Sequence, residues 1–382
     1  MKKVIFAFLA VLIMTGCSVK ENTYRIVETE QGKVILNRAI PANPDFAVNL
    51  KYSGQIFNRQ SKNDSLGFNW MMDIVELPDR NYAVLGNNTK GQILLYNSDY
   101  EIIRSFSKLG YGPGESNGYS RLLLMNNKLY AFFNGSDQVN VFDPNGEFIE
   151  SFRFGFIITE ITKLSEKRLI ATRWEHLTLD SEKDELTIEN ILMDNNFKKI
   201  KIVDSYYKTV DHKLSAGAQL YPFICGNETD IYISWISDSE YKIDVYNTES
   251  GEKKYQIKKD YRIYYYNDSE MDRMSEMNKV NMKEKFGRIK KRAINEIFTD
   301  KYAFLWVLGT KERSSDDITV MYADIFKDGV YINTVNFLEF VYYDWTGSRF
   351  YYKLRFIAGK LIYFNADEFN DERGRCIKFF DY

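Results

Sequence analysis

The sequence predicts an all-β protein, a six-bladed β-propeller with a helical insertion between the fourth and fifth blades. Three observations support this fold class. The chain contains 28 Tyr and 27 Phe but only 6 Pro, a composition that suits pleated, half-buried strands. Two strand-turn-strand patterns alternate along the chain, six times each. The sixth unit lacks its last strand, which a ring closed by the N-terminal segment would supply.

The chain begins with the pattern of an export signal. Two lysines precede an apolar run at 4–14. Thr15, Gly16 and Cys17 follow this run directly. The run is too short to be a stable membrane-spanning helix. A basic start, an apolar stretch and small residues before a cleavage site are typical of a signal peptide. We therefore expect residues 1–16 to be removed.

The end of this signal, Met-Thr-Gly-Cys at 14–17, resembles the lipobox of bacterial lipoproteins. The resemblance implies diacylglycerol on the thiol of Cys17 and a lipidated tether at 17–23. Two or more acyl chains anchor a protein durably. Ser18 implies sorting to the outer membrane, with the domain facing the periplasm or the cell surface. An ordinary secretory signal with an incidental cysteine is the alternative.

The first repeated pattern is an apolar run, a polar turn and a second run with aromatic residues. Apolar and polar residues alternate on both sides of a turn rich in Asn, Asp, Gly or Lys, which predicts a β-hairpin. The six copies lie at 74–86, 122–134, 161–173, 223–235, 297–309 and 354–366.

The second pattern is a strand that ends in an aromatic residue or Met, followed by a polar turn and another strand. The two patterns interleave strictly, which predicts six units of four strands. Units of this kind at intervals of roughly 50 residues are typical of propeller blades. Two separate β-sandwiches are the alternative. The copies lie at 93–106, 139–152, 190–203, 243–257, 323–335 and 377–382.

The sixth unit stops at Tyr382, where its fourth strand should begin. An unpaired sheet edge is prone to wrong pairing, so it needs a cover. The N-terminal segment has two strand-like stretches, at 24–36 and 46–56. We expect one of them to supply the outermost strand and so to close the ring.

Between the first and second units, residues 109–115 read LGYGPGE. This segment, followed by an apolar strand, resembles the linker of six-bladed β-propeller lipoproteins of Bacteroidetes, the TolB-like and NHL-like propellers. The phrases at 93–106, 141–152 and 304–309 resemble the same group. The resemblance implies the propeller fold for residues 24–382 and no particular ligand. The sequence departs from the pattern of this group in the turn of the fourth unit and in the N-terminal segment.

Residues 268–298 differ in kind from the repeats. Their apolar residues recur mostly at steps of three and four, which predicts one or two amphipathic helices. We expect a helical insertion packed across one propeller face. A partner or lid surface is the alternative, because Met-rich faces adapt to varied ligands; a membrane-surface helix is a further one. The apolar residues are Met271, Met274, Met277, Val280, Phe286, Ile289, Ala293 and Ile297.

The sequence has no strong catalytic motif. His176 and His212 are the only histidines, and no HExxH, paired CxxC, GxSxG or Walker A pattern occurs. We expect both histidines at the surface, no metal site and no cofactor. The acidic stretches 180–185 and 367–372 are expected to be solvated, with a calcium site as the alternative.

Charge and cysteine content narrow the function further. A net charge of −2 has no electrostatic footprint for nucleic acid. Beyond Cys17 the chain has only Cys225 and Cys376. A disulfide between them is allowed in an oxidising compartment, but two separate buried thiols are favoured.

These observations favour a lipid-anchored envelope binding or scaffold protein of unknown ligand, which recognises a glycan, a peptide or a protein through a propeller face, over an enzyme. A lyase or hydrolase that uses channel carboxylates is the alternative, and it depends on analogy with other propellers. A subunit of an envelope assembly that docks through 268–298 is a third hypothesis. The candidate ligand-binding residues lie near inner-strand ends or, for Glu115, near the axis; they are Trp70, Glu115, Arg121, Arg173, Trp174 and Trp235.

Overall fold

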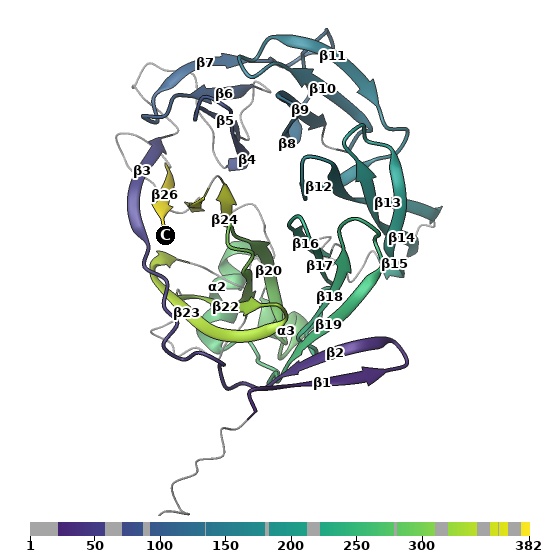
Figure 1. The fold of residues 1–382 in the computed structure, drawn as a ribbon, viewed down its shortest axis with the longest axis vertical. Helices are drawn as coiled ribbons and strands as arrows, with labels where there is room; N and C mark the ends of the chain where they lie inside the picture. The colour runs from purple at the N-terminus through teal and green to yellow at the C-terminus, as the bar shows by residue number, and fades with distance from the viewer. Residues whose placement is uncertain are drawn as a thin grey trace, which may run out of the picture.

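Six small antiparallel sheets surround a central axis in a computed structural model of the chain (Figure 1). This arrangement confirms the six-bladed β-propeller. Five sheets have four strands, and the sheet of the fourth blade has six. The structure describes residues 22–57, 71–86, 92–133, 135–179, 183–211, 222–278, 281–309, 320–341, 352–357, 359–365 and 376–382.

Each blade is a meander whose strands run in order from the axis to the rim. Blade 1 comprises β4 (Met71–Glu76), β5 (Tyr82–Gly86), β6 (Ile93–Tyr96) and β7 (Ile102–Phe106). Blade 2 comprises β8 (Tyr119–Met125), β9 (Lys128–Phe133), β10 (Gln138–Phe142) and β11 (Phe148–Arg153). Blade 3 comprises β12 (Ile158–Lys163), β13 (Arg168–Leu179), β14 (Lys183–Asp194) and β15 (Lys199–Asp211). Blade 4 comprises β16 (Phe223–Gly226), β17 (Asp230–Ser234), β18 (Lys242–Asn247) and β19 (Lys253–Lys259). Blade 5 comprises β20 (Ile294–Thr299), β21 (Leu305–Gly309), β22 (Val320–Lys327) and β23 (Val330–Val341). Blade 6 comprises β24 (Tyr352–Ile357), β25 (Lys360–Asn365), β26 (Cys376–Asp381) and β3 (Lys51–Phe57).

The core consists of apolar layers between the blades. In the described part of the chain, six clusters of buried side chains each join two neighbouring blades. The second strand of a blade is sandwiched on both faces, and β5 is buried along its whole length. Full burial on both faces explains why these strands are continuously apolar instead of alternating. The ring is therefore stabilised by hydrophobic contacts that repeat around the axis.

The N-terminal segment closes the ring, as the sequence predicted. Strand β3 pairs antiparallel with β26 and forms the outer edge of blade 6, with Ile56 opposite Ile377. Figure 1 shows the purple β3 beside the yellow β26. Ile56 is fully buried in the cluster between blades 6 and 1. Closure thus joins the two ends of the described chain by backbone hydrogen bonds and apolar packing.

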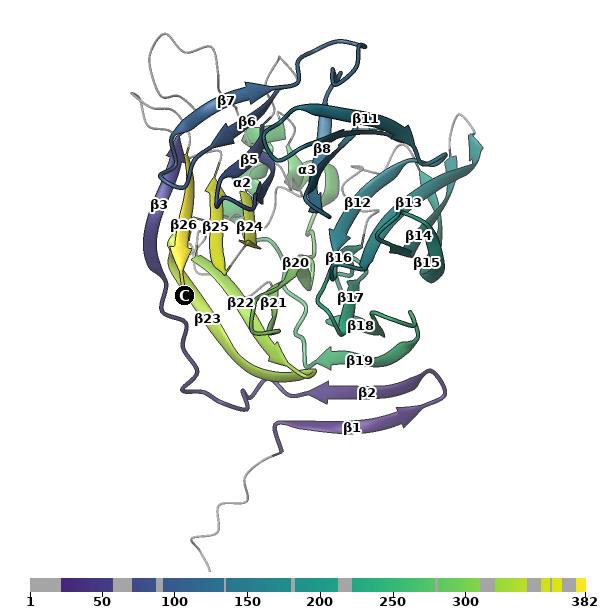
Figure 2. The same ribbon diagram turned by 45° about the horizontal axis from the view of Figure 1, so that its top comes forward.

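The first two strands extend blade 4, which the sequence did not predict. Strands β1 (Tyr24–Thr29) and β2 (Gly32–Asn37) form a hairpin, and β2 pairs in parallel with β19. Figure 2 shows the hairpin lying against the outer side of β19. The side chain of Asn37 donates to the carbonyl of Gly329, 2.9 Å, and accepts from the N–H of Tyr331, 2.8 Å. The hairpin is therefore attached to blade 5 as well.

The helical insertion lies between blades 4 and 5, as predicted, but it is shorter than the apolar spacing indicated. Helix α2 (Asp268–Asn278) and helix α3 (Met282–Phe286) are followed by extended chain, and β20 begins at Ile294. The N–H of Lys291 donates to the carbonyl of Tyr264, which holds this stretch extended. Ile289 and Ala293 are thus outside the helices, and Ile297 belongs to a strand.

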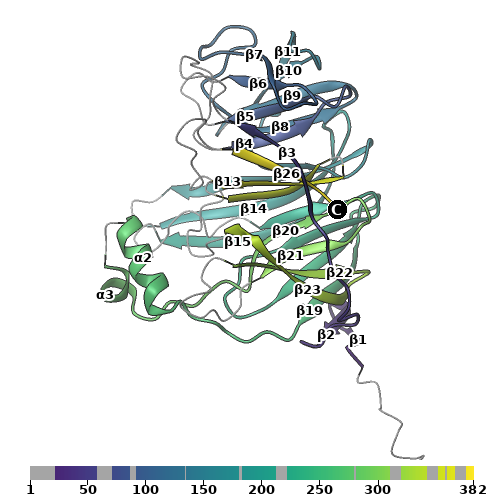
Figure 3. The ribbon, with the colours of Figure 1, turned by 90° about the vertical axis from the view of Figure 1, so that its left-hand side faces the viewer.

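The insertion has a fixed attachment. Glu270 and Asn267 cap α2 reciprocally, because each side chain accepts from the backbone N–H of the other, 2.8 and 2.9 Å. Glu270 also forms a buried ion pair with Lys291. Figure 3 shows the helices on one side of the ring and β1 on the other. In the described part of the chain, no helix is both long and apolar enough to cross a membrane.

Candidate functional site

The axis of the ring contains a funnel of about 500 Å³. All six inner strands contribute to its wall, namely β4, β8, β12, β16, β20 and β24. A concave site that collects residues from every repeat is where a propeller can assemble a binding site from positions far apart in the sequence. The funnel is therefore the candidate site, and its chemistry depends on what each inner strand presents.

Four inner strands present a charged residue at the same register position. Asp73, Arg121, Glu160 and Glu296 each lie directly after a register shift in the pairing of the first and second strands of their blade. A β-bulge changes the direction of the side chain that follows it. The repeated shift thus directs a charged side chain of each of these blades toward the axis. The opposing residues are Leu85, Phe132, Thr172 and Leu308.

Arg121 and Glu160 form a bidentate ion pair between blades 2 and 3. The Arg121 Nε donates to Glu160 Oε2 at 2.9 Å, and the Arg121 Nη2 donates to Glu160 Oε1. The side chains are only 12% and 20% exposed. Burial alone would lower the pKa of Arg121, but the carboxylates of Glu160 and Asp73 raise it above its usual value. Arg121 is therefore a permanent cation in the funnel wall.

Asp73 joins three blades. Its side chain, 1% exposed, accepts from Arg355 Nη1 of blade 6 at 2.9 Å. It also accepts from the N–H of Leu122 in blade 2 at 2.9 Å and from that of Ile74 at 3.0 Å. A buried carboxylate with this many donors is held in one orientation. Asp73 thus fixes the relative position of the inner strands around it.

Aromatic rings and a thiol also line the funnel. Phe298 and Phe356 lie 5.5 Å apart between ring centres and contribute to the funnel lining. Cys225 lines it from blade 4, and burial together with the Glu296 charge raises the pKa of its thiol well above the usual range. A protonated thiol is a poor nucleophile. Cys225 and Cys376 lie in different blades and form no disulfide, as favoured from the sequence, but only Cys225 is buried, whereas Cys376 is partly exposed.

Of the residues proposed from the sequence, Arg121 lines the funnel, whereas Glu115 orders the linker between blades 1 and 2. The Glu115 Oε2 accepts from the N–H of Gly112 at 2.8 Å, and Lys108 Nζ lies 2.9 Å from Glu115 Oε1. These two donors lower the pKa of Glu115. A Cβ on Gly110 would lie 2.1 Å from Glu115 Oε2, so the close approach requires glycine.

The structure places Arg173 and Trp235 away from the funnel lining. Arg173 Nε donates to Glu189 Oε2 at 2.6 Å on the long hairpin of blade 3. Trp235 donates to Asp204 Oδ2 at 2.6 Å and packs on Tyr206, 4.8 Å between ring centres. Each is held by partners of its own.

Several other sequence expectations fall outside what the structure describes. Trp174 lies on β13, but its side chain and that of His176 are beyond the described part. Cys17, Trp70 and His212 lie outside the described residues, as does the acidic stretch 367–372. Among the described residues, no group of three or more His, Cys, Asp or Glu could hold a metal ion.

The sequence reading missed Asp73, Glu160, Glu296 and Arg355. The available signal was a charged residue inside an otherwise apolar inner strand, at the same place in several repeats. Aligning the repeats on their first residues would have revealed it, because a charged residue directly precedes the copies at 74–86, 122–134, 161–173 and 297–309. Charge at a position that the repeat otherwise buries indicates a site instead of a solvated face.

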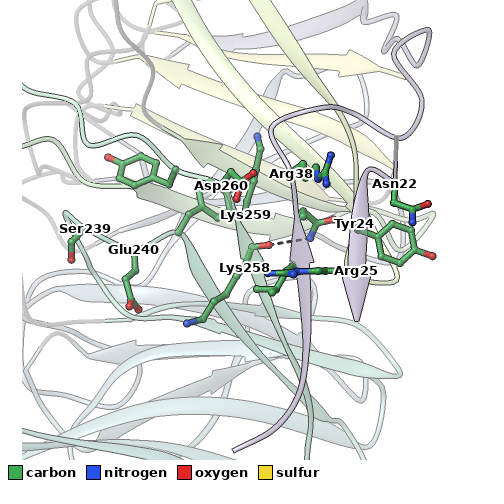
Figure 4. Close-up of a pocket in the computed structure, with 13 residues that line it drawn as sticks. Asn22, Tyr24, Arg25, Arg38, Ser239, Glu240, Lys258, Lys259 and Asp260 are labelled. Atoms are coloured by element: carbon green, nitrogen blue, oxygen red, sulfur yellow. Dashed lines mark hydrogen bonds between the residues drawn. The ribbon is translucent and has the colours of Figure 1, made fainter. Parts of the chain in front are cut away.

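A second hollow, of about 680 Å³, lies at the rim between the N-terminal hairpin and the end of β19 (Figure 4). Its wall includes Arg25, Lys258 and Lys259. Lys259 is bound to Asp324 at 2.8 Å and lies over the ring of Tyr331 at 3.7 Å. Asn37 donates to the Lys258 carbonyl at 3.2 Å. These contacts attach the hairpin to blades 4 and 5, so we interpret this hollow as part of that attachment.

A ring of six blades around a charged funnel defines the class as a six-bladed β-propeller with an axial site. No protein-family model and no curated protein matches the chain. Two solved structures are similar. One, from Bacteroides fragilis, is provisionally described as an exported protein; it is 13% identical over 91% of this chain and 99% of that chain, with a TM-score of 0.50. The other is a member of the DUF4221 family from Bacteroides vulgatus, 12% identical over 87% and 98%, with a TM-score of 0.51.

Identities this low show a shared fold alone. Both neighbours come from Bacteroides. The finer assignment to TolB-like or NHL-like propellers stays a prediction.

Proposed function

We propose that this protein is an exported, lipid-anchored binding protein of the cell envelope, and that its axial funnel binds a small polar ligand or a side chain of a peptide or protein. One observation carries the proposal: four inner strands place charged side chains at one level of the axial funnel. Buried charges are costly unless they are paired, so sequences rarely place them at equivalent positions without a use.

The geometry favours binding over catalysis. Asp73 and Glu160 each form an ion pair with an arginine of the chain. A general acid or base needs a carboxylate oxygen within hydrogen-bond reach of the substrate, and a carboxylate held by such a partner is less well placed for that role. Such pairs are well suited to a rigid site that recognises charge. A lyase or hydrolase thus has less support from the described residues than a binding protein.

The anchor proposal rests on the signal pattern that ends at Cys17, followed by a short tether. Strand β1 and the helices lie on opposite sides of the ring (Figure 3). If Cys17 carries lipid in the outer membrane, the side with α2 and α3 points away from the bilayer. That side would then be open to a glycan, a peptide or an envelope protein.

A plug in the funnel tests the binding role. Thr162 lines the funnel on β12, and Thr162→Trp should fill it. The matched control is Ile149→Trp, on the exposed face of the outer strand β11. The full chain is screened against amino acids, short peptides and small saccharides by thermal shift. We expect at least one compound to raise the melting temperature of the wild type and the control but not that of Thr162→Trp. An equal shift in all three proteins would contradict the proposal.

A further inference from the structure

A basic stretch of the helical insertion, residues 283–292, lies on the side of the ring that is opposite strand β1 (Figure 3). It contains six Lys and Arg residues but a single acid, Glu284. One of the cations fastens the stretch to helix α2, because Lys283 Nζ lies 3.2 Å from the carboxylate of Asp268 and 2.9 Å from that of Asp272. The remaining cations are therefore carried by a segment with a fixed position.

The end of the basic stretch pairs with a segment of three tyrosines. Two backbone hydrogen bonds, of 2.8 and 3.1 Å, join residues 289–291 to residues 264–266. Side chains alternate between the two faces of such an extended pair. Lys291 is buried at the inner face, where it forms its ion pair. Lys290 and Tyr265, which lie opposite each other, therefore point to the outer face.

Arg288 is oriented on this outer face by an aromatic ring. Its guanidinium lies over the ring of Tyr265, 3.8 Å from the ring centre. Stacking occupies the flat face of a guanidinium and leaves the N–H groups at its edge available. Lys285, Arg288 and Lys290 are all exposed, and none of the three forms an ion pair with any residue that the structure describes. An external anion can thus reach them without breaking an internal pair.

Exposed apolar side chains lie beside these cations. Phe286 is 45% exposed, and Lys285 Nζ is 5.1 Å from the centre of its ring. Ile263 is 38% exposed and lines a pocket of about 220 Å³ together with Tyr265 and Arg288. Tyr, Phe and Arg are enriched in protein interfaces. A peptide can bury Phe286 and Ile263 under its own apolar side chains, whereas a strongly hydrated polysaccharide cannot.

We propose that the insertion binds an acidic peptide segment of another protein, one that also contains apolar residues. A carboxylate of the segment would pair with the edge of the Arg288 guanidinium, and an apolar side chain would be buried against Phe286. A basic segment would be repelled. The site is separate from the funnel, so this inference goes beyond the proposed function and needs no funnel ligand. This distal surface consists of Ile263, Tyr265, Lys285, Phe286, Arg288 and Lys290.

Fluorescence anisotropy of the full chain with labelled synthetic peptides of equal length tests the inference. The first peptide repeats Asp-Asp-Leu, the second has Lys in place of each Asp, and the third has Ser in place of each Leu. We expect the first to bind, more tightly than the third, and the second not to bind. Added salt should weaken the binding, because the exposed charges are then screened.

Variants locate the binding on the distal surface. Arg288→Gln and Phe286→Ser should each weaken binding of the first peptide by about tenfold, the loss typical of an interface residue that carries much of the affinity. The matched controls are Arg80→Gln, an exposed arginine of blade 1, and Ile149→Ser, an exposed apolar residue of blade 2. Both should leave the binding unchanged, as should the funnel plug Thr162→Trp.

Several results would overturn the inference. They are equal binding by wild type and Arg288→Gln, no binding of the first peptide, equal binding of the first and third peptides, and binding of the second. Displacement of the peptide by a lower concentration of polygalacturonate would overturn it too, because it assigns the surface to an anionic polysaccharide. Loss of binding in Thr162→Trp alone would place the peptide in the funnel, which contradicts this inference but supports the proposed function.

Discussion

Gly54, in the closing strand β3, is where one added methyl group should damage the ring most. Its φ is +153°, and a Cβ built there would lie 2.0 Å from Cε2 of Tyr100. Tyr100 belongs to the β6–β7 turn of blade 1 and stacks on Phe379 of blade 6, 4.6 Å between ring centres. It also stacks on Tyr82 at 5.8 Å. Gly54→Ala therefore forces apart the aromatic contacts that join the last blade to the first.

The expected cost has two parts. An L-residue in this region of φ costs about 1–2 kcal/mol. Overpacking a filled site costs about 1–3 kcal/mol more. Gly54→Ala should thus lower the free energy of unfolding by about 2–5 kcal/mol in total. Gly32→Ala is the matched control, since Gly32 has φ +103° but nothing within 4 Å of the added Cβ, so only the first part applies.

Urea unfolding of the full chain measures both variants. In a Tyr100→Ala background the collision is absent, so Gly54→Ala should there cost only about 1–2 kcal/mol. Nonadditivity of about 1–3 kcal/mol is the signature of the contact between the two residues. If Gly54→Ala and Gly32→Ala cost the same, or if the double variant is additive, the explanation of the closure is refuted.

Three further outcomes are expected. Lys291→Met leaves Glu270 buried without its cation and should lower the free energy of unfolding in urea by about 3–5 kcal/mol. The double variant Lys291→Met/Glu270→Met should recover most of this stability. If it recovers none, the charge argument is wrong. Glu115 has a pKa below its ordinary value of 4.5, so its stabilising effect is present above that pH and is lost as the pH falls through the lowered value. The urea midpoints of wild type and Glu115→Gln should therefore differ at pH 7, and the difference should shrink as the pH falls below 4.5; an undiminished difference at pH 3 would refute this. Cys17→Ser should abolish labelling with radioactive palmitate and release the protein from membranes, and continued labelling would exclude Cys17 as the lipid site.

The blades could be predicted because their information is local. Each hairpin shows its own alternation and its own turn, as at 74–86 and 122–134, and nearest-neighbour strands pair within one unit. The closing strand followed from counting, since a missing edge has to be filled. The attachment of β1 and β2 to blade 4 could not be foreseen, because parallel pairing with β19 joins segments that are remote in the sequence.

The helical spacing shows why local patterns extend too far. Residues spaced by three or four predict a helix through Ile297, but the helices end at Phe286. Beyond that point, backbone hydrogen bonds to residues 264–266 compete with the helix and hold the chain extended. Tertiary contacts decided the boundary, because a short helix has little stability of its own.

In the candidate site too, the sequence identified some residues and only the tertiary structure identified the others. Arg121 was recognised from its place near an inner strand, but its partners were not, since Glu160 and Asp73 belong to other blades. Glu115 and Trp235 looked like ligand-binding residues until the structure showed their partners, Gly112 and Asp204. By itself the sequence determined the repeat, the blade count and the hairpins, all of which depend on short-range alternation. Only the tertiary structure decided which charged side chains meet at the axis, because that depends on the register of six strands separated by whole blades.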